Sequence, residues 1–380
     1  MSSSPASGKH SRKLYDLPEI LREPADLPKD LPRVRHEFEG IWPHEDGWLI
    51  RGWAAAQNAA WTKAILFLNG NRIGEALPWD REDLKAHSGH LPNITGAGFR
   101  FVVDKSLIDP DTTHRADVVL CKQNDPIASI WSLLRTDIAE IVPHPPEHLM
   151  KRVIGTDDAS YFLRFALTCF GQYTAAVTRH REMSTIKSML DWGCGCGRVT
   201  AHYLRIVNGP AVTGCDIDPE DIDWCKDNLV DGRFDATSPF VPLPYGNGEF
   251  DLVVSLSVMT HLTKDQQEKW LAEIDRVLAP GGLFVCSVHG VFGAQALPDS
   301  FMVERLKKQD IVDGQLDHVL DGIAPAGYYR ATYETGTYTR KSFGKHFDVL
   351  ELGEGGVGVQ DLVVARKREA KKGLLGQLRR

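Results

Sequence analysis

Several features are scarce or missing in this sequence, and each absence excludes a class of protein. No run of eighteen apolar residues occurs, so we expect no transmembrane helix and no integral membrane contact. The first residues lack the apolar stretch of a secretory signal, so we expect a cytoplasmic protein. The seven cysteines are odd in number and irregularly spaced, which is not typical of a disulfide framework. The net charge of −7 lacks the basic excess of a general nucleic-acid binder.

The length and composition predict a globular protein with more than one domain. The chain has 380 residues, of which 42% are hydrophobic and 25% are charged, enough apolar material for two cores. Shifts in texture along the chain predict five parts. These are a flexible N-terminal arm (1–35), a β-sandwich domain (36–135), a linker (136–150), an α/β domain (151–367) and a basic tail (368–380) that is either solvated or contacts a partner or a membrane surface.

The stretch from 36 to 135 has the texture of an antiparallel β domain. Short runs alternate apolar and polar residues between turn signals, and Asn69-Gly70 predicts a tight hairpin. Residues 38–122 also resemble the β-sandwich modules attached to bacterial enzymes of cell-surface glycan biosynthesis. That resemblance lies in Gly52-Trp53-Ala54, the hairpin, and Gly98-Phe99. It implies a glycan precursor as one class of substrate.

From residue 187 onward, strand-like and helix-like segments alternate, following a helix expected over 162–180. Residues 264–278 have helical periodicity, and Thr263 with Gln266 forms a capping-box pattern before them. Such alternation predicts βαβ units, that is, a parallel sheet with helices on both faces. The last two strand-like segments, 347–353 and 360–367, are expected to pair antiparallel.

A glycine-rich turn joins the first of these strands to the next helix. Residues 189–199 read MLDWGCGCGRV. In an open parallel sheet, ligands bind beyond the carboxyl ends of the strands, where glycines allow close approach and a helix N-terminus offers free amides. The dinucleotide fingerprint needs a third glycine where this chain has Arg198, and the P-loop sequence Gly-Lys-Ser/Thr is absent. The pattern favours a cofactor that carries an adenosine but does not rely on a pyrophosphate cradle.

The second strand ends in an acidic residue, Asp216, about nineteen residues after Gly197. A carboxylate at the tip of that strand can accept hydrogen bonds from both ribose hydroxyls. Asp216 could instead cap the following helix, although Asp218, directly before Pro219, suits that role better. Ile217 offers an apolar side chain to the face of an adenine.

These segments together resemble class I S-adenosylmethionine-dependent methyltransferases. The resemblance lies in LDWGCGCGR, CDID, LPYGNGEFDLVVSLSVMTHL and RVLAPGGLFVCSVHG, in that order, and covers about 150–367. It implies a Rossmann-like, seven-stranded α/β fold and S-adenosyl-L-methionine as the cofactor. The cofactor-binding residues that it implies are Asp191, Gly193, Cys194, Gly195, Gly197, Asp216, Ile217, Thr237, Ser238, Ser255 and Ser257.

The resemblance also assigns roles within that set. The glycine loop would hold the methionine part of the cofactor, and Asp191 would orient the loop or reach the methionine ammonium through water. Thr237 and Ser238 would lie near the adenine edge. Ser255 and Ser257 would line the methyl-donor pocket.

Two histidines are candidate catalytic residues. His261 and His289 each follow a strand end on the ligand side of the sheet, where either could remove a proton from an acceptor hydroxyl, or could simply cap or pack. The segment 300–345 is expected to be either an acceptor lid or a surface hairpin. Its aromatic and basic residues are Tyr328, Tyr329, Tyr333, Tyr338, Arg330 and Arg340.

The sequence therefore predicts methyl transfer to a small molecule or glycan precursor, most readily on oxygen. Other interpretations stay open: a non-catalytic S-adenosylmethionine-binding module, or a nicotinamide-dependent oxidoreductase, which Arg198 disfavours. A zinc site among Cys194, Cys196, Cys215 and Cys225 lacks the paired spacing of structural zinc ligands, and no histidine is identified as the partner of a cysteine nucleophile. No metal and no nucleic-acid partner are expected.

Overall fold

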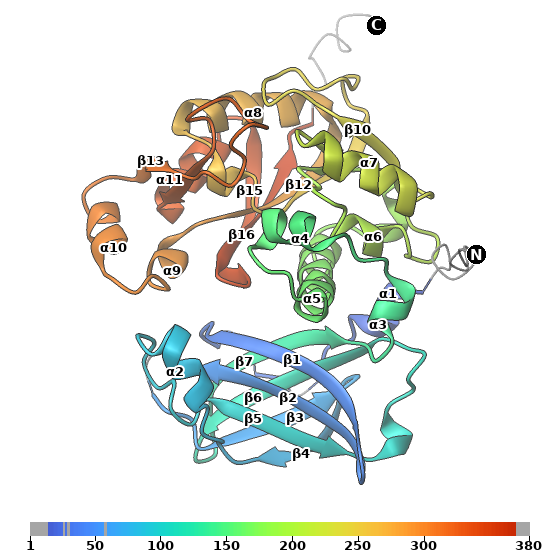
Figure 1. Cartoon of the computed structure of the whole chain (residues 1–380), viewed down its shortest axis with the longest axis vertical. Helices are drawn as coiled ribbons and strands as arrows, with labels where there is room; N and C mark the ends of the chain where they lie inside the picture. Colours follow the sequence, from blue (N-terminus) through green and yellow to red (C-terminus); the bar gives the residue numbers. More distant parts are fainter. Residues whose placement is uncertain (1–13, 26, 29–30, 57–58, 370–380) are drawn as a thin grey trace, which may run out of the picture.

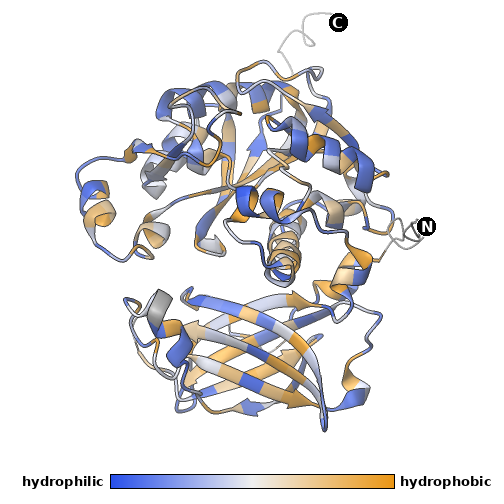
Figure 2. Ribbon diagram, in the orientation of Figure 1, coloured by the Kyte–Doolittle hydropathy of each residue, from blue (hydrophilic) through white to orange (hydrophobic). Residues whose placement is uncertain are grey.

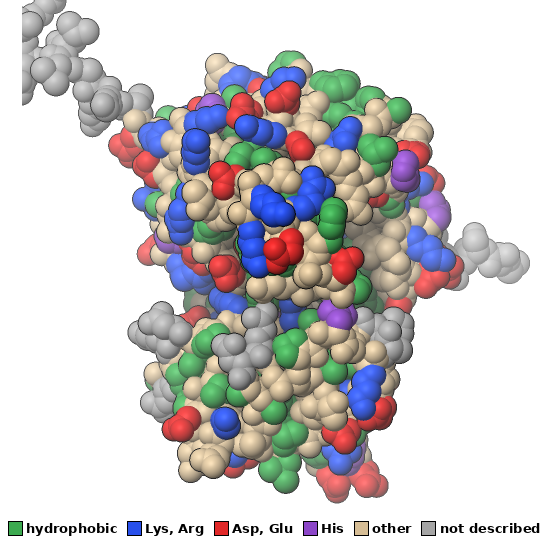
Figure 3. Space-filling view, turned by 90° about the vertical axis from the view of Figure 1, so that its left-hand side faces the viewer, with side chains coloured by type: hydrophobic (Ala, Val, Ile, Leu, Met, Phe, Trp, Pro, Cys, Tyr) green, Lys and Arg blue, Asp and Glu red, His purple; other side chains and the backbone are tan. Residues whose placement is uncertain are grey.

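The computed structural model describes residues 14–25, 27–28, 31–56 and 59–369. Two parts are stacked along the long axis of the molecule, with antiparallel sheets below and an α/β part above (Figure 1). Within the described residues, no helix is both long and apolar enough to cross a membrane. On the face drawn in Figure 3, lysine and arginine side chains are interspersed with acidic ones rather than gathered into one large basic field.

A seven-stranded sheet forms the centre of the α/β part. In spatial order its strands are β10 (Arg233–Ala236), β9 (Ala211–Asp216), β8 (Ser188–Trp192), β11 (Phe250–Ser255), β12 (Leu278–Val288), β16 (Gln360–Lys367) and β15 (Phe347–Val357). The first five are parallel, whereas β16 runs antiparallel to β12 and β15. The predicted Rossmann-like α/β sheet and its antiparallel final pair are confirmed.

The strand order reverses beside β8, because β9 lies on one side of it and β11 on the other. In an open α/β sheet, a crevice forms at such a switch point, beyond the carboxyl ends of the strands. The turn between β15 and β16 lies at this same edge, since Asp361 pairs with Val288 at the end of β12. The topology therefore brings the glycine loop, the ends of β11 and β12, and this turn to one edge of the sheet.

Helices cover both faces of the sheet. They include α4 (Glu147–Ile154), α5 (Ala159–Thr178), α6 (Thr200–Tyr203), α7 (Pro219–Asn228), α8 (Lys264–Val277) and α11 (Gly336–Phe343). The predicted cap of α8 is confirmed, because the Thr263 hydroxyl accepts from the Gln266 amide at 3.3 Å. Hydrophobic residues dominate α5 and the central strands, which is typical of elements buried on more than one side (Figure 2).

The segment between β12 and β15 lies over the same edge of the sheet. It contains α9 (Val291–Ala294), α10 (Phe301–Leu306), and a two-stranded ribbon of β13 (Ile311–Leu316) and β14 (Arg330–Glu334). A bridge joins His289 to Tyr333, so the ribbon packs directly after the end of β12. Of the two expectations for residues 300–345, a lid fits this placement better than a free surface hairpin.

The lower part consists of two antiparallel sheets. One contains β1 (Arg35–His44), β2 (Gly47–Ala55) and β5 (Gly98–Val103), and the other contains β4 (Asn71–Ala76), β3 (Lys63–Leu68), β6 (His114–Lys122) and β7 (Asp125–Leu134). A short helix, α2 (Glu82–Ser88), precedes β5. The sheets pack face to face around buried side chains such as Ile50, Phe99, Leu66 and Val118. The predicted hairpin between β3 and β4 is confirmed, with positive φ at both Asn69 and Gly70.

The predicted linker is not an open connection. Residues 138–141 form a short helix, α3 (Ile138–Ile141), and the segment then leads into α4. Apolar residues here, including Val142 and Leu149, are buried in the same core as α5. The prolines end the first helix and begin the second without preventing either, because Pro146 occupies the N-cap of α4, where no amide donor is needed.

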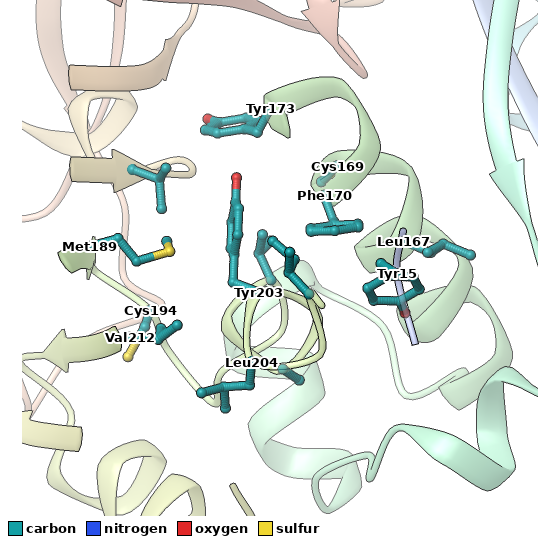
Figure 4. Packing of buried hydrophobic residues seen from close by; sticks show 14 of the residues in the cluster. Tyr15, Leu167, Cys169, Phe170, Tyr173, Met189, Cys194, Tyr203, Leu204 and Val212 are labelled. Carbon is teal, nitrogen blue, oxygen red and sulfur yellow. The ribbon is translucent and has the colours of Figure 1, made fainter. Parts of the chain in front are cut away.

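The predicted N-terminal arm is also partly wrong, because its described portion is ordered against the α/β part. Residues 1–13 lie outside the described residues. A short helix, α1 (Leu17–Ile20), packs into the core, and Tyr15 is fully buried with its hydroxyl 2.7 Å from His202 Nδ1. In Figure 4, Tyr15 lies beside Leu167 and Phe170 of α5. The basic tail at 368–380 lies outside the described residues from 370 onward.

This contact also explains why α6, the helix that follows the glycine loop, ends already at Tyr203. The carbonyl of Arg205 accepts the amides of Leu14 and Tyr15, and Ile206 bridges to Tyr15. The backbone after Tyr203 therefore pairs with the N-terminal segment instead of continuing the helix.

Candidate active site

A cavity lies at the switch point of the seven-stranded sheet, with an empty volume of about 980 Å³ including its mouth. The glycine loop forms one wall and the ends of β9 and β11 form others. Two side chains of the lid segment, Tyr328 and Tyr329, also line it.

The glycine loop needs glycine for reasons of both backbone conformation and space. Gly193 has φ +74°, and a Cβ there would lie 2.1 Å from Val258 Cγ2 across the cavity wall. Gly197 has φ +73°, and its Cβ would lie 2.4 Å from Leu229 Cδ1. Gly193, Cys194 and Gly195 line the cavity as predicted, whereas Gly197 faces α7 and is a packing residue. The prediction that Gly197 contacts the ligand is therefore not supported by its position.

Asp216 connects the second strand to the glycine loop. Its carboxylate accepts the Gly195 amide at 2.7 Å and the Asp218 amide at 3.0 Å, while its side chain lines the cavity. Burial raises its pKa, and these amides oppose the rise. Asp218 caps α7 by accepting from the Glu220 amide at 3.0 Å, so the assignment of the cap to Asp218 is confirmed. Asp216 is thus free of the capping role and is presented to the cavity.

Asp191 sits at the end of β8 and fixes the start of the following helix. It is buried, lines the cavity and accepts a hydrogen bond from the Thr200 hydroxyl at 2.5 Å. Burial raises its pKa to about 6, and the Thr200 bond opposes that rise. This placement agrees with the expectation that Asp191 orients the loop.

On the adenine side, two of the three expected residues reach the cavity. Ile217 and Thr237 line it, and the Thr237 amide donates to the Asp216 carbonyl at 2.8 Å. Ser238 does not line it: its hydroxyl instead accepts the Phe240 amide at 3.1 Å and closes a local turn. The predicted contact of Ser238 with the adenine edge is therefore not supported, because this turn engages its hydroxyl outside the cavity.

Ser255, the last residue of β11, and Ser257, two residues further on, also differ in their placement. Ser257 lines the cavity with φ +64°, and its hydroxyl is 3.1 Å from Gln360 Oε1. Ser255 is fully buried and outside the lining, and its carbonyl accepts the Tyr173 hydroxyl at 2.9 Å. Ser255 is still within β11 and buried, whereas the positive φ of Ser257 redirects the chain after the strand, so the predicted pocket role of Ser255 is not supported by its position.

Sequence reasoning did not identify two buried charged side chains in the cavity wall. Asp221, on α7, is 3% exposed, and one of its oxygens has no partner among the described residues. Burial and the neighbouring carboxylates Asp216 and Asp218 raise its pKa to about 8. Arg198 lies over the ring of Phe165, with two guanidinium nitrogens unpartnered within the described chain. Asp221 follows the Asp218 cap by three residues, a helical spacing that could have signalled its inward face.

The two candidate catalytic histidines lie beside the cavity rather than in its lining. Their rings are 6.2 Å apart, and His261 stacks at 4.0 Å on Tyr329, which does line the cavity. His261 Nδ1 faces the Arg330 carbonyl at 3.2 Å, and His289 Nδ1 faces that of Thr332 at 3.3 Å. Gln360 lies between Ser257 and His289, with its Nε2 3.4 Å from His289 Nε2.

Both histidines are held in the neutral form. Burial lowers the pKa of each to about 4, and the Asp317 carboxylate and the Arg330 carbonyl oppose this change for His261. A carbonyl can only accept, so each Nδ1 carries the proton and each Nε2 carries a lone pair. That form can accept a proton at Nε2, and a pKa of about 4 makes each imidazole a weak base at neutral pH.

The remaining candidates separate into two groups. Tyr333 stacks on His289 at 4.7 Å, whereas Tyr338 is buried near Glu334 and Ser342, away from the cavity.

All seven cysteines are free and buried. No group of three or more metal-ligating side chains occurs in the described parts of the chain.

The fold and this site are those of a known class, and sequence comparison identifies it. Residues 190–286 match the family model described as a methyltransferase domain. Residues 190–286 thus belong to a methyltransferase domain, which agrees with the predicted enzyme class and with S-adenosylmethionine as the predicted cofactor. Both predictions, the enzyme class and the cofactor, are confirmed.

Individual proteins show the same similarity. An uncharacterized methyltransferase of Synechocystis sp. is 32% identical over 98 residues, which is 26% of this chain and 45% of that protein. A sterol 24-C-methyltransferase of Gibberella zeae is 25% identical over 296 residues, 72% of this chain and 70% of that protein. A solved S-adenosylmethionine-dependent methyltransferase of Methanosarcina mazei is 17% identical, covers 51% of this chain and 98% of that chain, and has a TM-score of 0.39. The chain thus spans less than half the length of the first of these relatives.

Proposed function

We propose that this chain transfers a methyl group from S-adenosylmethionine to an oxygen atom of a small-molecule acceptor. A glycan precursor is the candidate suggested by the resemblance of residues 38–122 to modules of glycan-biosynthesis enzymes. The observation that supports oxygen as the target is a pair of neutral histidines, His261 and His289, beside the cavity. An acceptor hydroxyl must lose a proton during methylation, and a neutral imidazole can take it.

The residues present fit the cofactor. Gly193 and Gly195 line the cavity with backbone alone, and a Cβ at Gly193 would clash with Val258 in the cavity wall. The Asp216 carboxylate lines the same part of the cavity. We propose that Asp216 accepts the ribose hydroxyls and that Ile217 and Thr237 flank the adenine. Arg198 has unpartnered buried guanidinium nitrogens that suit the carboxylate of a methionine group, and Asp221 has an unpartnered buried oxygen that can accept from its ammonium.

When bound, the sulfonium supplies an already activated methyl group, so this chain's residues have to position the acceptor and manage one proton. Ser257 and Gln360 form a hydrogen-bonded pair that can orient an acceptor oxygen near the cavity. The Nε2 of His289 accepts from the Gln360 amide at 3.4 Å, and we propose His289 as the first candidate to take the proton. His261 supports Tyr329 by stacking and is the second candidate base.

The organisation that we propose keeps the boundaries expected from the sequence, with an all-β domain over 36–135 and a methyltransferase domain over 151–367. Contacts of α5 with β1 and β7 join the two parts. We propose that the all-β part also borders the edge of the sheet where acceptors would enter, since Arg35 of β1 donates to the Phe292 carbonyl of α9.

Calorimetric titration with S-adenosylmethionine, its demethylated product and NAD tests the proposal. We expect micromolar binding of the first two and none of NAD. Asp216→Ala should weaken both by at least tenfold, because about 1.4 kcal/mol or more of charge-assisted hydrogen bonding is lost. Asp223→Ala is the matched control, since Asp223 is an exposed acidic residue of α7 outside the cavity.

Binding of NAD, or no binding of either sulfur compound, would overturn the assignment. A panel of alcohols, carboxylates and amines, scored by release of the demethylated product, then separates the enzyme from a non-catalytic binding module. Turnover with amines alone would refute the choice of oxygen.

A further inference from the structure

A second cavity lies between the all-β part and the α/β part. Its empty volume, including its mouth, is about 890 Å³, and its lining comes from three places far apart in the sequence: strands β1 and β2, helix α5, and the turn between β15 and β16. The turn contributes Gly358 and Val359. Since that turn lies at the carboxyl edge of the parallel strands, the interdomain cavity extends to the same edge of the sheet as the active site.

Two arginines in the lining have guanidinium nitrogens without partners. Arg35, from β1, is 4% exposed. One of its nitrogens donates to the Phe292 carbonyl, and the other two have no partner among the described residues. Arg164, from α5, donates to the Ser160 hydroxyl through one nitrogen, while its Nε is buried and unpartnered in the described chain. A buried donor without a partner is destabilising, so these groups are arranged for something that accepts from them.

The remaining lining suits a compact ring next to an anion. Tyr161 and Phe165 stack with their planes 6° apart, and Trp53 lies across the cavity on β2. The acidic residue of the lining is Glu37, which accepts a long hydrogen bond from Trp53 at 3.4 Å. Two arginines against one carboxylate leave an excess of positive charge within the lining.

The interdomain cavity and the active-site cavity share a wall. The guanidinium of Arg198 lines the active site and lies 5.3 Å from the centre of the Phe165 ring, which lines the interdomain cavity. On the other side, Val359 is followed directly by Gln360, the residue that contacts both Ser257 and His289. A molecule bound in the interdomain cavity against Val359 is therefore one residue away from Gln360, which contacts His289, the proposed proton acceptor.

We infer that the interdomain cavity is the acceptor site, and that Arg35 and Arg164 bind a phosphate or carboxylate group carried by the acceptor. This inference rests on the proposed methyl transfer and names its substrate class: a small anionic molecule with a ring that packs on Tyr161 and Phe165. The all-β part supplies Arg35, so it is a component of the substrate site. Arginine is suited to this role because its planar fork binds either anion through two parallel bonds.

Titration with simple probes tests the inference before the natural acceptor is known. The probes are phenyl phosphate and benzoate, with benzyl alcohol as the uncharged control, each at constant ionic strength and followed by ligand-observed NMR. We expect at least one anion to bind at least tenfold more tightly than benzyl alcohol. Binding of phenyl phosphate alone would identify a phosphorylated acceptor, and binding of benzoate alone would identify a carboxylate.

Variants then locate the binding. Arg35→Gln and, independently, Arg164→Gln should each weaken the bound anion by at least tenfold, and either result is informative if the other variant fails to fold. Arg179→Gln is the matched control, because Arg179 follows α5 but pairs with Glu351 outside the interdomain cavity. S-adenosylmethionine titration of each variant should stay within twofold of the parent.

The inference is overturned if neither anion binds, if benzyl alcohol binds equally well, or if both cavity variants bind the anion as the parent does. Failure of the parent to bind S-adenosylmethionine would instead refute the proposed function, so the two outcomes are distinguishable.

Discussion

The tightest steric constraint in the active site concerns Gly193, and it leads to a quantitative prediction for Gly193→Ala. The left-handed backbone at φ +74° costs an alanine about 1–2 kcal/mol. The new methyl would also lie 2.1 Å from Val258 Cγ2, well inside van der Waals contact, and such overpacking costs about 1–3 kcal/mol. We therefore expect the free energy of unfolding to fall by about 2–5 kcal/mol.

A double-mutant cycle separates the two contributions. Val258→Ala alone should cost about 1 kcal/mol, because Val258 is only partly buried. In Gly193→Ala/Val258→Ala the clash is absent, so the loss should be smaller than the sum of the single variants by about 1–3 kcal/mol. Gly74→Ala is the control, since a Cβ there meets nothing within 4 Å.

Urea unfolding measures the stabilities, and titration with S-adenosylmethionine should show binding at least tenfold weaker in Gly193→Ala. Additive losses in the cycle, or a Gly193→Ala protein within about 0.5 kcal/mol of the parent, would show that the loop and Val258 are not packed in this way.

Two further predictions concern buried groups. The raised pKa of Asp221 means that the folded protein holds this proton up to about pH 8 while the unfolded chain releases it near 4, so the contribution of Asp221 to stability is lost as pH rises through this range. Between about pH 4 and 8, the free energy of unfolding of Asp221→Asn should therefore rise relative to that of the parent by about 1.4 kcal/mol per pH unit. Urea unfolding at pH 4.5, 6 and 8 measures this difference, and a difference that does not change with pH would contradict the prediction. Tyr15→Phe removes the only described partner of His202 Nδ1 in a fully buried pair and should lower the free energy of unfolding by about 1–3 kcal/mol; an unchanged urea midpoint would show that the N-terminal segment is not docked.

Elements whose signals are local could be predicted from the amino-acid sequence. Apolar periodicity and the capping box identified α8, the Asn69-Gly70 pair identified the first hairpin, and alternating segments identified the parallel sheet. These features depend on residues within a few positions of each other, where backbone preference and side-chain period act directly. The glycine loop and Asp216 could be predicted as well. The loop follows directly after a strand and Asp216 ends the next one, and in a parallel sheet the ends of neighbouring strands lie at the same edge.

Tertiary structure alone decided which side chains face the cavities. Ser255 and Ser257 are two residues apart, yet one is sealed under Tyr173 and the other has a positive φ and faces Gln360. Gly197 packs on α7 while its neighbours in the loop line the cavity. In each case the outcome depends on a partner far along the chain, which no local pattern encodes.

The largest differences arise where distant segments meet. Tyr15 and His202 are 187 positions apart, and their contact both orders the N-terminal segment and shortens α6. Arg35 and Phe292 are 257 positions apart, and that contact helps form the interdomain cavity. Burial and the availability of hydrogen-bond partners are properties of the packed molecule, so the charged groups that remain unpartnered, Arg35 among them, became visible only in the tertiary structure.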